Sequence, residues 1–106
     1  MQTPFFVRQN GVLKKIDPAE VICLFTEGNY TKIFLTNHIY YLVRATLSGT
    51  IKKLPKDTFI RINRKTVASI YFMDQIARDH LIIEGETVPI TKQYYASMLA
   101  QLNIIE

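Results

Sequence analysis

The sequence predicts a mainly β fold with two short helices. Turn-forming residues recur at short intervals along all 106 residues, and the segments between them are rich in β-branched and aromatic residues. Two segments instead have apolar residues at helical spacing. No linker or low-complexity segment divides the chain, so we expect one domain over 1–106. The turn signals are Asn10-Gly11, Asp17-Pro18, Gly28, Asn37-His38, Leu54-Pro55, Arg78-Asp79 and Glu84-Gly85.

The first predicted elements are a hairpin, a helical turn and a central strand. Asn10-Gly11 tolerates positive φ at both positions and separates two apolar runs within 5–16, which predicts a β-hairpin. Asp17 before Pro18 predicts an acidic cap on a single helical turn. The strand over 21–27 is apolar on both faces, so we expect it in the middle of a sheet.

An antiparallel meander and a short helix are predicted next. Strands are expected over 30–36 and 39–43. Thr46 then caps a helix over 47–54, which ends because the residue before Pro55 disfavours helical geometry. The inner face of this helix is Leu47, Ile51 and Leu54. Lys52 and Lys53 project away from it.

The second half is predicted to hold further strands and a final helix. The expected strands are 60–69 with a break near Asn63, 71–76, 81–83 and 87–90. Thr91 is expected to cap a helix over 92–102. The inner face of that helix is Tyr95, Met98, Leu99 and Leu102.

The composition favours a soluble, cytoplasmic protein. Because Cys23 is the only cysteine, an internal disulfide is excluded and a reducing setting is favoured. No apolar run approaches the ~18 to 20 residues that cross a bilayer, and 1–7 is too short and uncharged for a signal peptide. We therefore expect no membrane partner.

Enzymatic chemistry is poorly supported, and no cofactor or metal is expected. His38 and His80 sit at predicted turns without acidic or cysteine neighbours at ligand or triad spacing. Cys23 lies in an apolar strand, which is typical of a small core side chain. The four glycines form no phosphate-binding loop, and the acids form no paired-carboxylate motif. We expect no catalytic residues.

The distribution of charge indicates an anionic partner. The chain has 13 basic and 9 acidic residues, a formal charge of +4 and a pI near 9.3. Seven cations and one anion fall between Arg44 and Lys65, which suits a phosphate backbone and predicts salt-dependent binding. A solvated helix and turn surface would show the same pattern, so this signal alone leaves both interpretations open.

Three polar segments stand where a strand meets a turn or a helix begins, and such positions can enter a DNA groove. The first is 29–32, in which alternation sends Thr31 and Lys32 to opposite faces. The second is 61–65, where an irregular backbone would let Arg64 and Lys65 project together. For Arg61 we favour a structural ion pair with Asp57 or Glu27. The third is 91–93, where Lys92 adds charge to a helix N-terminus.

The order and spacing of five motifs resemble the LytTR DNA-binding domain over about residues 5–102. The motifs are Glu27-Gly28-Asn29-Tyr30, Tyr41-Leu42-Val43-Arg44 leading into Leu47, Leu54-Pro55, Phe59-Ile60-Arg61-Ile62-Asn63-Arg64 and Val88-Pro89-Ile90-Thr91-Lys92. The resemblance implies an elongated stack of small antiparallel sheets with two short helices. It also implies the output domain of a bacterial response regulator in a two-component system, which is compatible with a receiver domain in a longer native chain.

The same resemblance implies how the domain regulates transcription. Its loops would enter successive major grooves of duplex DNA, two copies would bind a direct repeat, and the duplex would bend. The base-contacting positions of the family fall on Thr31 with Lys32 adjacent, on Arg64 and on Lys92. The chain departs from the family pattern at Asn63 for histidine, Lys65 for serine, Ser69 for asparagine and Thr91-Lys92 for Ser-Arg. Lys92 keeps the charge but loses the bidentate fork of arginine, which favours a phosphate contact or a looser base preference.

The predicted DNA-binding residues are Thr31, Lys32, Asn63, Arg64, Lys65, Lys92 and Gln93, with Arg44, Lys52 and Lys53 as weaker phosphate contacts. Two alternatives remain open. A protein-interaction module could use the basic stretch against an acidic partner. A single-stranded nucleic-acid binder could stack bases on Tyr30, Tyr40, Tyr41 and Phe34.

Overall fold

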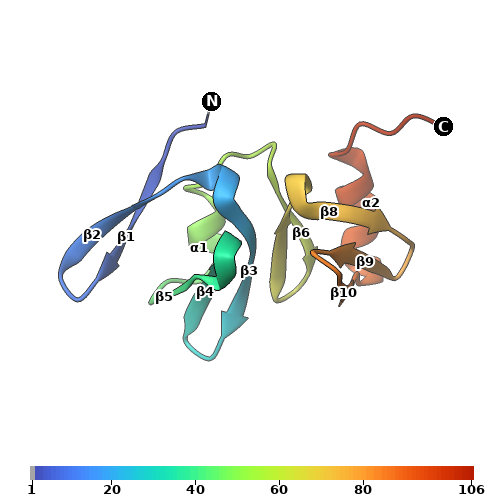
Figure 1. Cartoon of the computed structure of the whole chain (residues 1–106). Coiled ribbons are helices and arrows are strands. Elements are labelled where there is room, and N and C mark those ends of the chain that lie inside the picture. The colour runs from blue at the N-terminus through green and yellow to red at the C-terminus, as the bar shows by residue number, and fades with distance from the viewer. Residues whose placement is uncertain (1) are drawn as a thin grey trace.

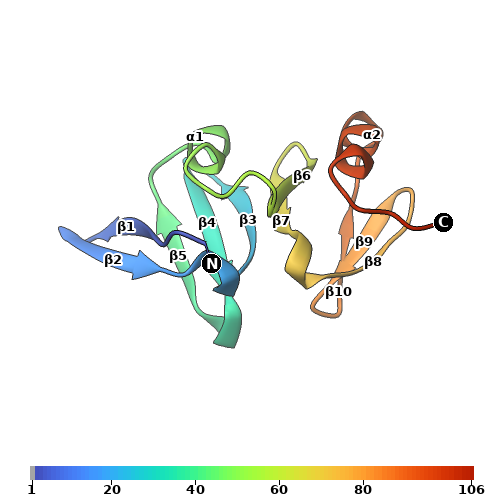
Figure 2. The same cartoon turned by 90° about the horizontal axis from the view of Figure 1, so that it is seen from above.

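A computed structural model describes residues 2–106, in which three antiparallel sheets and two short helices follow one another along an elongated molecule (Figures 1 and 2). Its principal extents are 47 × 31 × 24 Å. The predicted β-rich class and the two helices are therefore confirmed. The N-terminal hairpin lies at one end of the molecule, and α2 with the three-stranded sheet lies at the other.

The elements have the following bounds and order. The two-stranded sheet pairs β1 (Phe5–Gln9) with β2 (Val12–Ile16). The five-stranded sheet has the order β5 (Tyr40–Val43), β4 (Tyr30–Leu35), β3 (Val21–Glu27), β7 (Thr66–Ser69) and β6 (Phe59–Asn63). The three-stranded sheet has the order β10 (Glu86–Pro89), β9 (His80–Ile83) and β8 (Met73–Ile76). The helices are α1 (Leu47–Ile51) and α2 (Lys92–Ala100), and single 3₁₀ turns lie at Pro18–Glu20, Thr36–His38 and Ile70–Phe72.

The first half follows the predictions closely. Asn10 and Gly11 adopt φ of 51° and 80° at the tip of the β1–β2 hairpin, as its turn requires. The Asp17 carboxylate accepts a hydrogen bond of 2.9 Å from the Ala19 amide and so caps the helical turn at Pro18–Glu20. The strand β3 lies third of five, so its central position is confirmed.

The helix α1 is shorter than predicted because its last turn tightens. The Thr46 hydroxyl accepts from the Gly49 amide at 3.0 Å, which confirms the predicted cap. Regular α-helix ends at Ile51, and i to i+3 bonds from the amides of Lys53 and Leu54 carry the chain on. Leu54 is thereby still buried beside Leu47.

Two strand predictions in the second half need correction. The segment 60–69 is not one strand with a break but a hairpin, in which Phe59 pairs with Ser69 and the chain reverses at Arg64-Lys65. The predicted strand 71–76 begins only at Met73. The reason is that the Ser69 hydroxyl accepts from the Tyr71 amide and starts a 3₁₀ turn.

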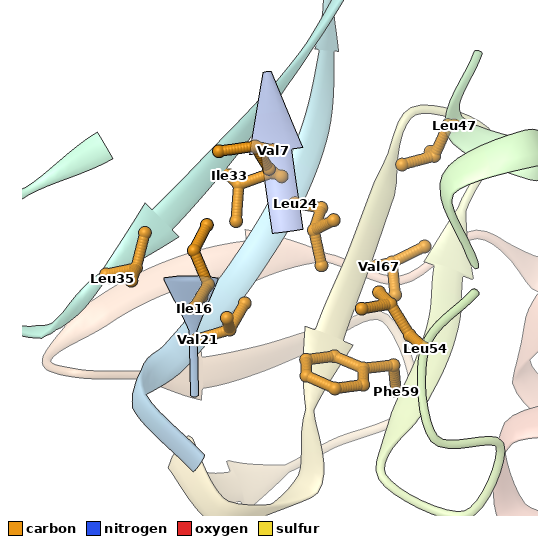
Figure 3. Packing of buried hydrophobic residues seen from close by; sticks show 10 residues of the cluster. All are labelled: Val7, Ile16, Val21, Leu24, Ile33, Leu35, Leu47, Leu54, Phe59 and Val67. Carbon is orange, nitrogen blue, oxygen red and sulfur yellow. The ribbon is translucent and has the colours of Figure 1, made fainter. Parts of the chain in front are cut away.

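Two hydrophobic cores lie on opposite faces of the β6–β7 hairpin. Figure 3 shows the first, to which Phe59 and Val67 contribute. Ile60, Ile62 and Ala68 belong to the second. The predicted inner face of α2 packs against the second core, because Met98 is buried in it and Tyr95, Leu99 and Leu102 contact it. Burial on both faces holds the hairpin firmly, and so fixes where its turn projects.

Candidate nucleic-acid interface

The turns that carry the predicted interface lie at one side of the molecule. The β3–β4 turn and the β6–β7 turn both point toward the lower edge of the view in Figure 1. The Thr26 amide donates to the Lys65 carbonyl at 3.0 Å and so joins the end of β3 to the β6–β7 turn. The Thr91 amide donates to the Ile62 carbonyl at 3.1 Å and joins the start of α2 to β6. The three predicted segments are therefore one connected structure.

Asn63 shapes the β6–β7 turn from inside. Its side chain is only 8% exposed. Its Oδ1 accepts from the Lys65 amide at 2.9 Å, and its Nδ2 donates to the Pro89 carbonyl at 2.8 Å. Both ends of the amide are thus engaged within the protein, and Arg64 and Lys65 are left exposed at the turn. The strand register also shifts between Arg61 and Asn63, so the predicted irregularity is present, and Arg64 and Lys65 both border the same pocket.

Arg61 joins the same turn to both helices. Its Nη1 donates to the Ser48 Oγ of α1 at 3.1 Å, and its Nη2 donates to the Arg64 carbonyl at 2.5 Å. Its Cζ lies 5.8 Å from the ring centroid of Tyr94 in α2. The prediction of a structural role is supported, but the predicted partners were wrong. Within residues 2–106 the only side chains within salt-bridge distance are His80 and Asp79, so neither Asp57 nor Glu27 pairs with Arg61.

The predicted segment 29–32, which covers the β3–β4 turn and the start of β4, places Thr31 and Lys32 on opposite faces, as alternation predicted. Thr31 is fully buried, and its hydroxyl donates to the Ala45 carbonyl at 2.8 Å. Lys32 lies on the opposite face, with its Nζ 4.1 Å from the ring centroid of Tyr40 and 5.1 Å from that of Phe34. Thr31 therefore connects β4 to the segment before α1, and Lys32 lies over aromatic rings.

The first turn of α2 presents Lys92 and Gln93 to solvent. Thr91 occupies the cap position with extended backbone, but its side chain makes no capping hydrogen bond. The position of the cap is confirmed, whereas its predicted hydroxyl contact is not formed. The free amides of this turn and the charge of Lys92 favour an anion at this end of the helix.

The three weaker phosphate candidates lie in two places. Arg44 is exposed and follows Val43, which pairs with Thr31 of the predicted segment 29–32. Lys52 and Lys53 follow α1 and border a groove formed with the N-terminal residues 2–4. Arg44 is thus close to the first predicted segment. The two lysines lie at the other end of α1.

A pocket of about 580 Å³ opens between the β3–β4 turn, the start of α1 and the β6–β7 turn. Arg61, Arg64 and Lys65 line one side of it. Asn29, from the predicted segment 29–32, also lines the pocket, as do Thr46 and Ser48, which the predicted interface did not include. The sequence marked Thr46 only as a helix cap and did not mark Ser48, because only the fold brings the start of α1 beside β6.

Two titratable groups outside this pocket have shifted pKa values. Burial raises the pKa of the Cys23 thiol to about 11, so the thiol is protonated near neutral pH. The pKa of Asp79 is lowered by its hydrogen bond with His80. Among residues 2–106 no group of His, Cys, Asp and Glu side chains could hold a metal ion. No helix in the same range is both long and apolar enough to span a membrane.

Comparisons with known proteins agree with the motifs and the fold. A family profile described as the LytTr DNA-binding domain matches residues 11–103. A similar solved structure is the LytTr DNA-binding domain of a protein described as a methyl-accepting/DNA response regulator from Bacillus cereus. The TM-score is 0.81 at 19% sequence identity, covering 98% of this chain and 100% of the other. No curated protein matches by sequence.

Proposed function

The chain belongs to the LytTR family of DNA-binding domains, and from this membership we propose that it recognises specific duplex DNA as the output domain of a bacterial transcription regulator. The observation that carries the proposal is the connected set of turns. Hydrogen bonds from Thr26 to Lys65, from Asn63 to Pro89 and from Thr91 to Ile62 hold three polar segments on one side of the molecule. Fixed spacing between such segments is what reading separate positions of a duplex requires.

Within this proposal the exposed cations make the contacts. Arg64 stands at the tip of the β6–β7 turn and is the best candidate for a bidentate contact with guanine. Lys65, Lys92 and Gln93 contact neighbouring bases or phosphates from the same side. Arg44, Lys52 and Lys53 contribute sequence-independent phosphate contacts.

The buried members of the predicted set act through the backbone. Thr31 has no exposed surface and its hydroxyl bonds Ala45, so we assign it the role of fixing the segment before α1. Asn63 likewise fixes the β6–β7 turn. The Lys32 ammonium lies over Tyr40 of the edge strand β5. We assign it a contact with a DNA phosphate at this edge.

The wider arrangement on DNA follows from the family. Two copies bind a direct repeat, their loops enter successive major grooves, and the duplex bends. A receiver domain in a longer native chain would control this binding. No catalytic step is needed for such a function.

Fluorescence anisotropy with labelled oligonucleotides tests the proposal against its two alternatives. Binding to a random duplex that weakens steeply with salt, with single strands bound less tightly, is the expected result. A preference for single strands would favour base stacking on the predicted aromatic residues Tyr30, Tyr40, Tyr41 and Phe34. Absence of binding to either form would favour a protein partner for the basic stretch.

A further inference from the structure

The pocket between the β3–β4 turn, the start of α1 and the β6–β7 turn has the chemistry of an anion site. Three cations line it, and among residues 2–106 no Asp or Glu does. Its other polar side chains are hydroxyls and an amide, contributed by Thr26, Asn29, Tyr30, Thr31, Thr46 and Ser48. A cavity with a net positive lining and neutral donors favours a compact anion over a cation or an apolar ligand.

The Arg61 guanidinium in the wall of this pocket has no acidic partner in the part of the chain that the structure describes. Its two protein partners, the Ser48 hydroxyl and the Arg64 carbonyl, are neutral acceptors. Its Nε is buried without a hydrogen-bond partner within residues 2–106. A partly buried charge that lacks an opposite charge is costly, so an anion in the pocket would stabilise it. Each terminal nitrogen also retains a second N–H beyond the hydrogen bond it donates.

We propose that this pocket binds one phosphate group, with the Arg61 guanidinium in its wall and Arg64 and Lys65 at its mouth. A planar guanidinium is well suited to two oxygens of a phosphate. Arg64 and Lys65 add positive charge at the mouth of the pocket from their positions in the β6–β7 turn. Arg61 then serves both as the residue that positions the turn and as part of the phosphate site.

Two sources can supply the phosphate. One is the backbone of bound duplex DNA, in which case the pocket anchors the domain beside the bases that Arg64 reads. The other is free phosphate in solution. Only the first source rests on the proposed function, because recognition of free phosphate requires no DNA.

NMR of the ¹⁵N-labelled chain tests the site directly, since the Nε–H of an arginine gives its own signal. Sodium phosphate is added at constant ionic strength against a matched sodium chloride series. We expect a saturable shift of the Arg61 Nε–H and of the Thr46 and Ser48 amides with phosphate only. No saturable shift, or the same shift with chloride, would overturn the proposal while leaving DNA binding untouched.

Two variants test whether the phosphate-induced shifts arise from binding in the pocket. Lys65→Gln removes an exposed charge at the mouth without touching either core, and is expected to weaken phosphate binding about two- to fivefold. The matched control Arg78→Gln alters an exposed arginine in the β8–β9 turn, outside the pocket. Its phosphate affinity should equal that of the wild type. An equal loss of phosphate affinity in both variants would indicate a general effect of net charge and would contradict a specific site in the pocket.

A duplex titration separates the two sources. If the DNA backbone is the source, a short duplex shifts the same Arg61 signal, and phosphate competes with the duplex at constant ionic strength. If the source is free phosphate, the signal responds to phosphate and stays unchanged with duplex. A phosphate response in a chain that binds no duplex at all would retain the pocket and overturn the proposed function.

Discussion

Asn63 Nδ2 donates a hydrogen bond of 2.8 Å to the Pro89 carbonyl, and this bond connects the β6–β7 turn to the strand that leads into α2. The other end of the same amide accepts from the Lys65 backbone. One nearly buried side chain thus sets the spacing between the turn that carries Arg64 and the helix that carries Lys92.

Replacing Asn63 with alanine should destabilise the fold and weaken DNA binding together. Two hydrogen bonds are lost, and at roughly 0.5 to 1.5 kcal/mol each the free energy of unfolding should fall by about 1 to 3 kcal/mol. Urea denaturation measures this change. Asn103→Ala, an exposed asparagine in the C-terminal tail, is the control and should leave the midpoint unchanged. A wild-type midpoint for Asn63→Ala would show that the amide does not support the turn.

Replacing Arg64 with alanine should reduce affinity for a specific site by about 1 to 3 kcal/mol and relax sequence preference at one position. Because the side chain is exposed, the unfolding midpoint should not change. Anisotropy titrations of specific and random duplexes measure both effects, with Arg78→Ala as the control. Unchanged specific affinity would remove this turn from the base-reading surface.

The double variant Lys52→Ala and Lys53→Ala should weaken specific and random duplexes alike. Phosphate contacts carry no sequence information, and each one lost should reduce the slope of log K against log salt by about 0.9. Titrations at several salt concentrations give the slope. If the slope does not change, the two lysines belong to the solvated end of α1, where they border the groove with residues 2–4.

Lys32→Met should lower the free energy of unfolding by about 0.5 to 1 kcal/mol, because methionine keeps much of the packing and removes the cation–π contact. The Lys32 ammonium lies 4.1 Å from the centroid of Tyr40. Lys15→Met, at an exposed lysine of the β1–β2 hairpin, is the control. An equal change in the two variants would mean that the aromatic rings contribute nothing to the effect.

Cys23 should react slowly with iodoacetamide near neutral pH. The thiolate is the reactive form, and raising the pKa from 9.0 to about 11 lowers its fraction at pH 8 by about a hundredfold. The rate should rise as the pH approaches 11 and should reach that of an ordinary thiol in urea. Mass spectrometry follows the reaction. A native rate equal to the unfolded rate at pH 8 would contradict the raised pKa.

Local chemistry made much of the fold predictable. The hairpin tip at Asn10-Gly11, the caps at Asp17 and Thr46, and the central position of β3 each depend on a few neighbouring residues. The reversal at Arg64-Lys65 was harder to predict, because apolar residues continue on both sides of it. Its cause is tertiary, since each face of the hairpin packs on a different core.

The exposed cations of the candidate interface could be predicted from the sequence, but the hydrogen bonds that position them could not. Arg64, Lys65 and Lys92 stand at element ends that the sequence marks, and all three are exposed. The bond from Arg61 to Ser48 could not be inferred, because it joins residues 13 positions apart through folding. For the same reason the ion pair with Asp57 or Glu27 was a reasonable but wrong expectation.

Sequence-specific recognition of duplex DNA can be measured by selecting bound sites from a random duplex library. Wild type and Arg64→Ala are selected in parallel. We expect an enriched motif with repeated half-sites for the wild type, and loss of preference at one base pair in each half-site for the variant. An unenriched wild-type pool, or identical motifs from the two proteins, would contradict this expectation.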